Sequence, residues 1–160
     1  MPAESQVEER IAATPLSLYR LVSDVTRMGE WSPETDSCRW LAGADGPEIG
    51  ASFRGSNRRG WRRWSTTCTV VAADPGRSFA FDVHLARLPI SRWTYDFDPD
   101  GDGCRVTESW TDRRPGWMVR LAPVVTGVRD QESHNRAGMR TTLARLRAAA
   151  ERVASGPTDG

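Results

Sequence analysis

The distribution of apolar and polar residues divides the chain into a short helical start, a long β-rich middle and a helical end. Residues 6–12 (QVEERIA) predict a first strand. Thr14 and Pro15 then predict the start of a helix, with threonine as the N-cap and proline in the first turn. Residues 25–31 predict a second short helix. The apolar stripe of these helices consists of Leu18, Leu21, Val22 and Val25.

Six further strands are predicted in the middle of the chain, where apolar residues alternate with polar ones between clusters of turn residues. The strongest turn signals are Asp74-Pro75-Gly76 and the DPDGDG run at 98–103. With the first strand, these make seven. The six predicted ranges are 36–41, 51–58, 61–73, 78–85, 90–97 and 105–111.

The helical end consists of residues 130–153, which are rich in helix formers. Their apolar stripe is Met139, Leu143, Leu146, Ala150 and Val153. One such helix can cover seven strands only if the sheet curves around it, so the predicted fold class is α+β. The segment 113–127 (RRPGWMVRLAPVVTG) is apolar but contains two prolines and looks too broken for one helix, so we expect a short helix or lid over a cavity mouth.

On five of the strands, one face is more apolar than the other, and we expect these five faces to form a single inner wall. The opposite faces look solvated; they carry Ser78, Asp82, Thr94, Asp96, Arg105, Thr107 and Ser109. A wall rich in aromatic side chains suits a flat, apolar ligand, although periodicity alone leaves a fully packed core equally open. The predicted wall consists of Phe53, Gly55, Asn57, Trp64, Thr66, Cys68, Val70, Phe79, Phe81, Val83, Trp93, Tyr95, Phe97, Val106, Glu108 and Trp110.

The order of these elements resembles the SRPBCC superfamily of helix-grip proteins. The resemblance rests also on EWSPE at 30–34, on the DPDGDG turn before CRVTESW, and on the closing helix. It covers residues 6–153 and is closest to polyketide cyclase/dehydrase-like proteins of actinobacteria. It implies one domain over 1–160 with a frayed tail at 154–160, and a cavity between sheet and helix, which makes the packed core the weaker alternative. The superfamily includes binders, carriers and enzymes, so the resemblance leaves function open.

Glu108 is the polar residue of the predicted wall that most directly suggests acid-base chemistry. A carboxyl group among apolar side chains has a raised pKa, which makes Glu108 a candidate acid or base for cyclisation or dehydration. Alternatively, Glu108 pairs with an Arg or Asn and only fixes the structure. Asn57 could orient a ligand oxygen or bond to its hairpin backbone. His134, early in the last helix, borders the cavity-facing side and could pair with Glu108.

Other residues are candidates for ligand contact. Trp31 could line the cavity or pack in the core, Glu34 is expected to cap or to be solvated, and His84 to be exposed. The complete set of predicted ligand-binding residues is Trp31, Phe53, Asn57, Trp64, Phe81, Trp93, Tyr95, Val106, Trp110, Asn135 and Met139.

Composition narrows the classes of partner. The three cysteines are widely spaced and predicted to be buried, free thiols, and no metal-binding or cofactor-binding motif is present. The polar N-terminus and the lack of a long apolar run predict a cytoplasmic location. The net charge of +1 gives no reason to expect nucleic acid or a membrane as a partner. The basic hairpin Arg58–Arg63 could hold an acidic carrier protein, and a monomer and a homodimer both remain open.

The sequence therefore predicts a protein that binds a small hydrophobic, aromatic or polyketide-like molecule. Whether it also catalyses cyclisation or dehydration of that molecule stays open. The alternatives are a non-catalytic lipid or isoprenoid carrier and an interaction module with a vestigial cavity.

Overall fold

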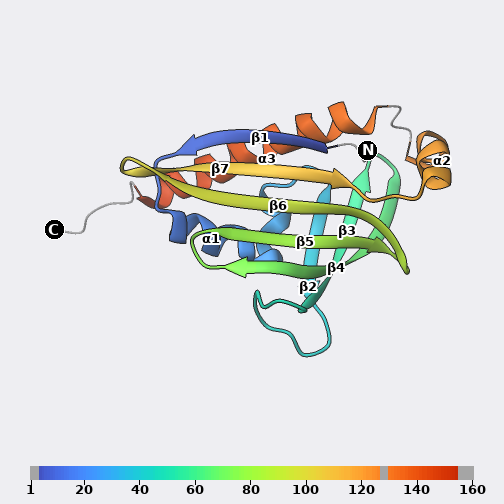
Figure 1. Cartoon of the computed structure of the whole chain (residues 1–160), viewed down its shortest axis with the longest axis horizontal. Coiled ribbons are helices and arrows are strands. Elements are labelled where there is room, and N and C mark those ends of the chain that lie inside the picture. The colour runs from blue at the N-terminus through green and yellow to red at the C-terminus, as the bar shows by residue number, and fades with distance from the viewer. Residues whose placement is uncertain (1–3, 127–129, 155–160) are drawn as a thin grey trace.

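A computed structural model describes residues 4–126 and 130–154 and shows one curved sheet with helices against its concave face (Figure 1). The predicted strands are all present, within a few residues of the expected ends. The tail predicted at 154–160 lies, apart from Ala154, outside the described residues. In chain order, the elements are β1 (Glu4–Ile11), α1 (Pro15–Ser23), the 3₁₀ helix η1 (Val25–Glu30), β2 (Thr35–Trp40), β3 (Ser52–Arg59), β4 (Arg62–Asp74), β5 (Ser78–Leu85), β6 (Leu88–Asp100), β7 (Gly103–Asp112), α2 (Gly116–Thr126) and α3 (Gln131–Ala154).

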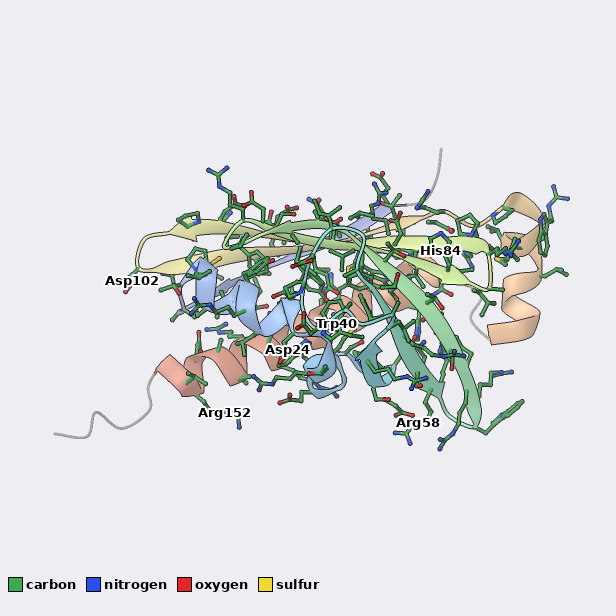
Figure 2. All side chains as sticks on the ribbon, turned by 90° about the horizontal axis from the view of Figure 1, so that it is seen from below. Asp24, Trp40, Arg58, His84, Asp102 and Arg152 are labelled. Carbon is green, nitrogen blue, oxygen red and sulfur yellow. The ribbon has the colours of Figure 1, made fainter. Side chains whose placement is uncertain are left out.

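The seven strands form one antiparallel sheet in the order β1-β7-β6-β5-β4-β3-β2. From β2 to β7, each strand lies next to the strand that follows it in the chain. β1 and β2 lie at opposite edges of the sheet, so the connection between them crosses its full width. Figure 2 shows α1 and α3 on the same side of the sheet, with β3 and β4 curling away from its plane at one end. This confirms the predicted α+β helix-grip architecture.

Local signals place the N-terminal helices as expected. The side chain of Thr14 accepts a hydrogen bond from the backbone N–H of Ser17 at 3.2 Å, which caps α1. Asp24 caps η1 in the same way through the N–H of Thr26. Gly29 lets η1 lie against β2, because a Cβ at this position would meet the backbone oxygen of Asp36 at 2.5 Å. These contacts fix the position of the loop that follows η1.

The core fills the space between the concave face of the sheet, α1 and α3. Ile11, Leu18, Phe79, Val106, Leu143 and Leu146 are all fully buried within one cluster. Full burial of one such side chain is worth about 1.5–3 kcal/mol, so this cluster is the main attachment of both helices to the sheet.

The short helix expected within 113–127 is present, but the second proline does not break it, and one prediction about burial is wrong. Residues 116–126 form a single helix, α2, that continues through Pro123 and lies beyond the end of the sheet (Figure 1). One interior proline removes only one backbone donor, and this helix tolerates the loss. Asp82, predicted to be solvated, is only 8% exposed. Arg92, directly opposite it on β6, and Arg113 cover its carboxylate on the outer face of the sheet.

Candidate functional site

The predicted inner wall faces the helices as expected. The aromatic and aliphatic members on β5, β6 and β7 are buried, and so are Phe53, Cys68 and Val70 on β3 and β4; Trp93 is half-buried. The register explains this arrangement, because Phe79, Tyr95 and Glu108 lie opposite one another on three neighbouring strands. Phe53 and Phe81 pack edge to face with ring centroids 5.2 Å apart. The alternation of the strands therefore predicted the orientation of the wall correctly.

Burial of the inner wall changes along the sheet. Phe97 and Val106, which lie toward the C-terminal part of α3, are fully covered. Toward the hairpin of β3 and β4, the inward residues Asn57, Trp64 and Thr66 are only half-buried. Asn57 there donates to the hydroxyl of Thr66 at 3.2 Å. The wall is therefore closed at one end and accessible at the other, which we call the open end.

Glu108 is the central polar group of the wall. It is 2% exposed, and its Oε1 accepts a hydrogen bond from the hydroxyl of Tyr95 at 2.8 Å. Its Oε2 is buried and has no hydrogen-bond partner. Burial raises the pKa of Glu108 to about 8, although the Tyr95 hydrogen bond acts in the opposite direction. At neutral pH Glu108 is therefore mostly protonated, so it has a proton to donate.

Tyr95 is the fixed partner of this carboxyl group. It lies directly opposite Glu108 in the pairing of β6 and β7. Burial, followed by the nearby carboxylate, raises the pKa of the Tyr95 phenol well above its usual value. Tyr95 therefore stays a neutral donor, which leaves Glu108 as the group of the pair that can change its protonation state near neutral pH. The expected partner of Glu108, an Arg or Asn, is replaced by a tyrosine.

The expected pairing of His134 with Glu108 is wrong. The Nε2 of His134 instead bonds to the carboxylate of Glu34, in the loop after η1. Arg59, at the end of β3, reaches the same carboxylate with an Nε–Oε1 distance of 2.7 Å. Its guanidinium also lies over the Trp64 ring. Glu34 thus joins the first turn of α3 to the hairpin, rather than capping a helix or being solvated.

The remaining candidates on the helices and turns occupy the core. Trp31 is 2% exposed, with the guanidinium of Arg27 5.3 Å from its ring. Asn135 is buried and accepts from the side chain of Gln131 at 2.8 Å, and Met139 is fully buried. His84, expected to be exposed, is half-buried beside a bulge in β5. Whether any of them contacts a ligand stays a prediction.

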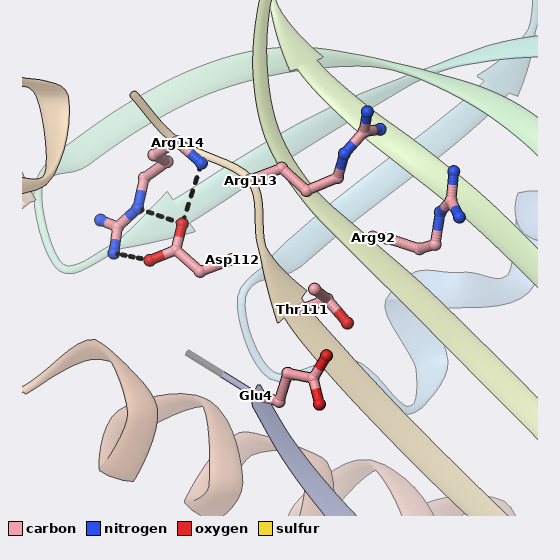
Figure 3. A pocket seen from close by; sticks show the side chains of 6 residues that line it. All are labelled: Glu4, Arg92, Thr111, Asp112, Arg113 and Arg114. Carbon is pink, nitrogen blue, oxygen red and sulfur yellow. Dashed lines mark hydrogen bonds and ion pairs between the residues drawn. The ribbon is translucent and has the colours of Figure 1, made fainter. Parts of the chain in front are cut away.

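Two hollows lie outside the space between the inner wall and α3. One of about 600 Å³ opens at the ends of β6 and β7 and is lined by Glu4, Arg92, Thr111, Asp112, Arg113 and Arg114 (Figure 3). Its charges are balanced, since Asp112 pairs with Arg114 at 2.7 Å and Asp82 with Arg92 and Arg113, so it is no anion site. A second, of about 690 Å³, lies on the outer face of the sheet. Neither hollow is lined by a residue of α3, so neither is the predicted cavity between sheet and helix.

The cysteines behave as predicted. Cys38, Cys68 and Cys104 are all buried and free. Burial raises the pKa of Cys38 to about 11, which keeps it a protonated, unreactive thiol at neutral pH. Among the described residues, no group of three His, Cys, Asp or Glu side chains could hold a metal ion. In the same part of the chain, no helix is long and apolar enough to cross a membrane.

Comparison with known proteins decides the family. Residues 2–151 match the family model described as "Polyketide cyclase / dehydrase and lipid transport". The chain belongs to this family. The resemblance inferred from EWSPE and the DPDGDG turn is therefore confirmed. No curated protein matches the sequence.

Solved structures of family-like proteins share the fold. A polyketide cyclase-like protein of Corynebacterium glutamicum is 29% identical, covering all of this chain and 98% of that one, with a TM-score of 0.62. Ginseng major latex-like protein 151 from Panax ginseng is 13% identical, covering 93% and 97%, with a TM-score of 0.71. The di-domain ARO/CYC StfQ from the steffimycin biosynthetic pathway is 17% identical, covering 96% of this chain and 52% of StfQ, with a TM-score of 0.75. At the lower identities, the likeness is one of fold alone.

Proposed function

We propose that this family member binds a small, largely apolar molecule, aromatic or polyketide-like, between the inner wall and α3, and that Glu108 donates and accepts a proton in its cyclisation or dehydration. One observation carries the proposal: a buried carboxyl group whose Oε2 has no partner faces the aromatic wall. An unsatisfied buried oxygen costs about 1–3 kcal/mol, which a ligand oxygen placed against it would recover.

Glu108 alone can give and take back the protons that the proposed reactions require. In a dehydration, protonated Glu108 gives its proton to a ligand hydroxyl, the C–O bond breaks and water leaves. The carboxylate then takes the proton from the neighbouring carbon, whose C–H electrons form the double bond, and Glu108 returns to its starting state. In an aldol cyclisation the enol form of the ligand's donor carbon attacks the carbonyl carbon as Glu108 gives its proton to the carbonyl oxygen, and the resulting carboxylate takes the enol O–H proton, which restores Glu108. Tyr95 holds Glu108 in position, and a rigid wall limits the conformations of a flexible chain.

Entry of the ligand is expected at the open end. Trp64 and Asn57 are half-buried there, whereas the side chains of the closed end pack on one another. Trp64 and Trp93 are the half-buried aromatic members of the wall, so their side chains are the ones we expect to shift as the ligand enters. A matched pair of variants tests this expectation: Trp64→Ala should change ligand uptake, whereas Ile49→Ala, in the exposed loop before β3, should not.

The function is tested in two steps. Native mass spectrometry of the protein purified from its own host identifies what co-purifies. Glu108→Gln is then compared with the wild type for affinity and turnover of that molecule. We expect affinity within a few-fold and turnover reduced by roughly 100-fold or more, as for the loss of a general acid. Unchanged turnover in Glu108→Gln would exclude Glu108 as the acid. If native mass spectrometry finds no small molecule and the affinity measurements detect no binding, the proposed ligand site would be excluded.

A non-catalytic lipid or isoprenoid carrier is the second candidate. The predominantly apolar wall and the lipid transport named in the family description favour it. A carrier should bind chains of different length with similar affinity and leave them chemically unchanged in both the wild type and Glu108→Gln. An acidic carrier protein at the Arg58–Arg63 hairpin, a cytoplasmic location and the oligomeric state stay predictions.

A further inference from the structure

Two protrusions carry exposed tryptophans at the same end of the molecule (Figures 1 and 2). One is α2, where Trp117 is 56% and Leu121 54% exposed. The other is the turn between β3 and β4, where Trp61 is 84% exposed. Single exposed apolar side chains are normal, but several that gather at one end of a molecule are typical of a binding surface. Both protrusions belong to the end at which the inner wall is accessible.

The same two segments are basic. Residues 51–73 contain five arginines and residues 113–126 contain three, and neither segment contains an acidic residue. Four of these arginines are paired with acidic residues elsewhere in the chain: Arg58, Arg59, Arg113 and Arg114. Arg62 lies 4.9 Å from the centre of the Trp61 ring. Arg62, Arg63 and Arg120 have no acidic partner within the described residues. The predicted basic hairpin and Arg120 of α2 thus place unpaired positive charge at one end of the molecule, which the net charge of +1 does not reveal.

We propose that this end, formed by α2 and the β3–β4 turn, docks on the surface of an anionic lipid bilayer. Tryptophan favours the boundary between lipid headgroups and acyl chains, and arginine is attracted to anionic headgroups. A bilayer would cover the apolar side chains of both protrusions at once and neutralise their arginines. An acidic protein bound to the hairpin alone would leave Trp117, Val119 and Leu121 of α2 in water.

Docking in this orientation has a consequence for the ligand site. The open end of the inner wall would face the bilayer, so an apolar molecule could pass between membrane and protein with little exposure to water. The inference does not depend on the chemistry proposed for Glu108. It holds for an enzyme that takes its substrate from a membrane and for a carrier alike.

The test is co-sedimentation of the whole chain with vesicles. We expect binding to vesicles that contain phosphatidylglycerol with phosphatidylcholine, and much weaker binding to phosphatidylcholine alone. Added salt should weaken the binding to the mixed vesicles, because it screens the arginines. Trp61→Ser should lower partitioning roughly tenfold, and the double variant Trp117→Ser with Leu121→Ser by more. Arg62→Gln and Arg63→Gln should each lower it roughly fivefold.

Matched controls separate docking from general damage. Val153 is 78% exposed near the far end of α3, so Val153→Ser removes an equally accessible apolar side chain and should bind vesicles as the wild type does. Circular dichroism checks that each variant is folded. Glu108→Gln should also bind vesicles normally, so a failure of the proposed chemistry and a failure of docking are distinguishable.

Three results would overturn the inference. The first is no binding to vesicles of either composition. The second is equal binding by the wild type, Trp61→Ser and the α2 double variant. The third is binding of an acidic carrier protein by the hairpin arginines while mixed vesicles remain unbound.

Discussion

Glu108 and Asp82 are buried carboxyl groups on opposite faces of the sheet, and they behave in opposite ways. Glu108, on the inner face, has one tyrosine hydroxyl as its partner, and burial raises its pKa to about 8. Asp82, on the outer face, accepts hydrogen bonds from Arg92 and Arg113, and the Arg92 bond lowers its pKa. Burial alone therefore does not make a carboxyl group an acid at neutral pH; the absence of a cationic partner does.

The largest effect expected from this contrast is in the pH dependence of stability. The native pKa of Glu108 lies above its ordinary value of 4.5, so the native state holds this proton more tightly between pH 4.5 and about 8. The contribution of Glu108 to stability is therefore greatest below pH 4.5 and is lost as the pH rises toward 8, by on the order of 4 kcal/mol. Glu108→Gln should remove this slope in urea unfolding measured across that range. Parallel curves for variant and wild type would show that Glu108 is not held protonated.

A smaller effect of opposite sign is expected on the outer face. The pKa of Asp82 is lowered in the native state. Asp82 therefore stabilises the fold above pH 3.8, the ordinary pKa of an aspartate, and this stabilisation is lost as the pH falls through the native pKa. Asp82→Asn should lower the free energy of unfolding at pH 7 by about 1–2 kcal/mol, since the arginine partners are partly exposed. Urea unfolding of the wild type and of Asp82→Asn at pH 7 and at acidic pH measures the stability loss and its dependence on pH. Thr94→Ala, a neutral outer-face change, serves as the control.

The smallest effect is expected from Tyr95, the hydrogen-bond partner of Glu108 on the inner face. Tyr95→Phe removes the hydrogen bond that Glu108 accepts within the part of the chain that the structure describes, and it should cost about 1 kcal/mol of stability. Because the Tyr95 hydrogen bond lowers the pKa of Glu108, its loss should raise that pKa further. Titration of the Glu108 carboxyl carbon by NMR would detect the shift. An unchanged or lower pKa would mean that Tyr95 does not control this group.

Much of the fold and part of the site could be predicted from sequence. Alternation alone identified the inward face of five strands, because side chains on a strand switch sides at every residue. It placed Glu108 correctly, since Val106 and Trp110 fix the register of β7 around it. The capping signals at Thr14 gave the start of α1.

The rest depended on contacts that periodicity does not encode. Glu34 and His134 are 100 residues apart in sequence and meet because the loop after η1 lies against α3. Asp82 is covered by an arginine from the next strand, so its burial required the register of β5 with β6. How fully the inner wall is packed depends on the conformations of many side chains at once, and no single segment determines it.

The position of β1 has a consequence for how the chain is made. This strand is synthesised before the other six, yet its neighbour in the sheet is β7, the last of the seven, with Glu4 opposite Thr111. A nascent chain therefore carries an unpaired N-terminal strand until the whole meander has left the ribosome. Closing so long a loop is slow, and we expect this step to limit the rate of folding.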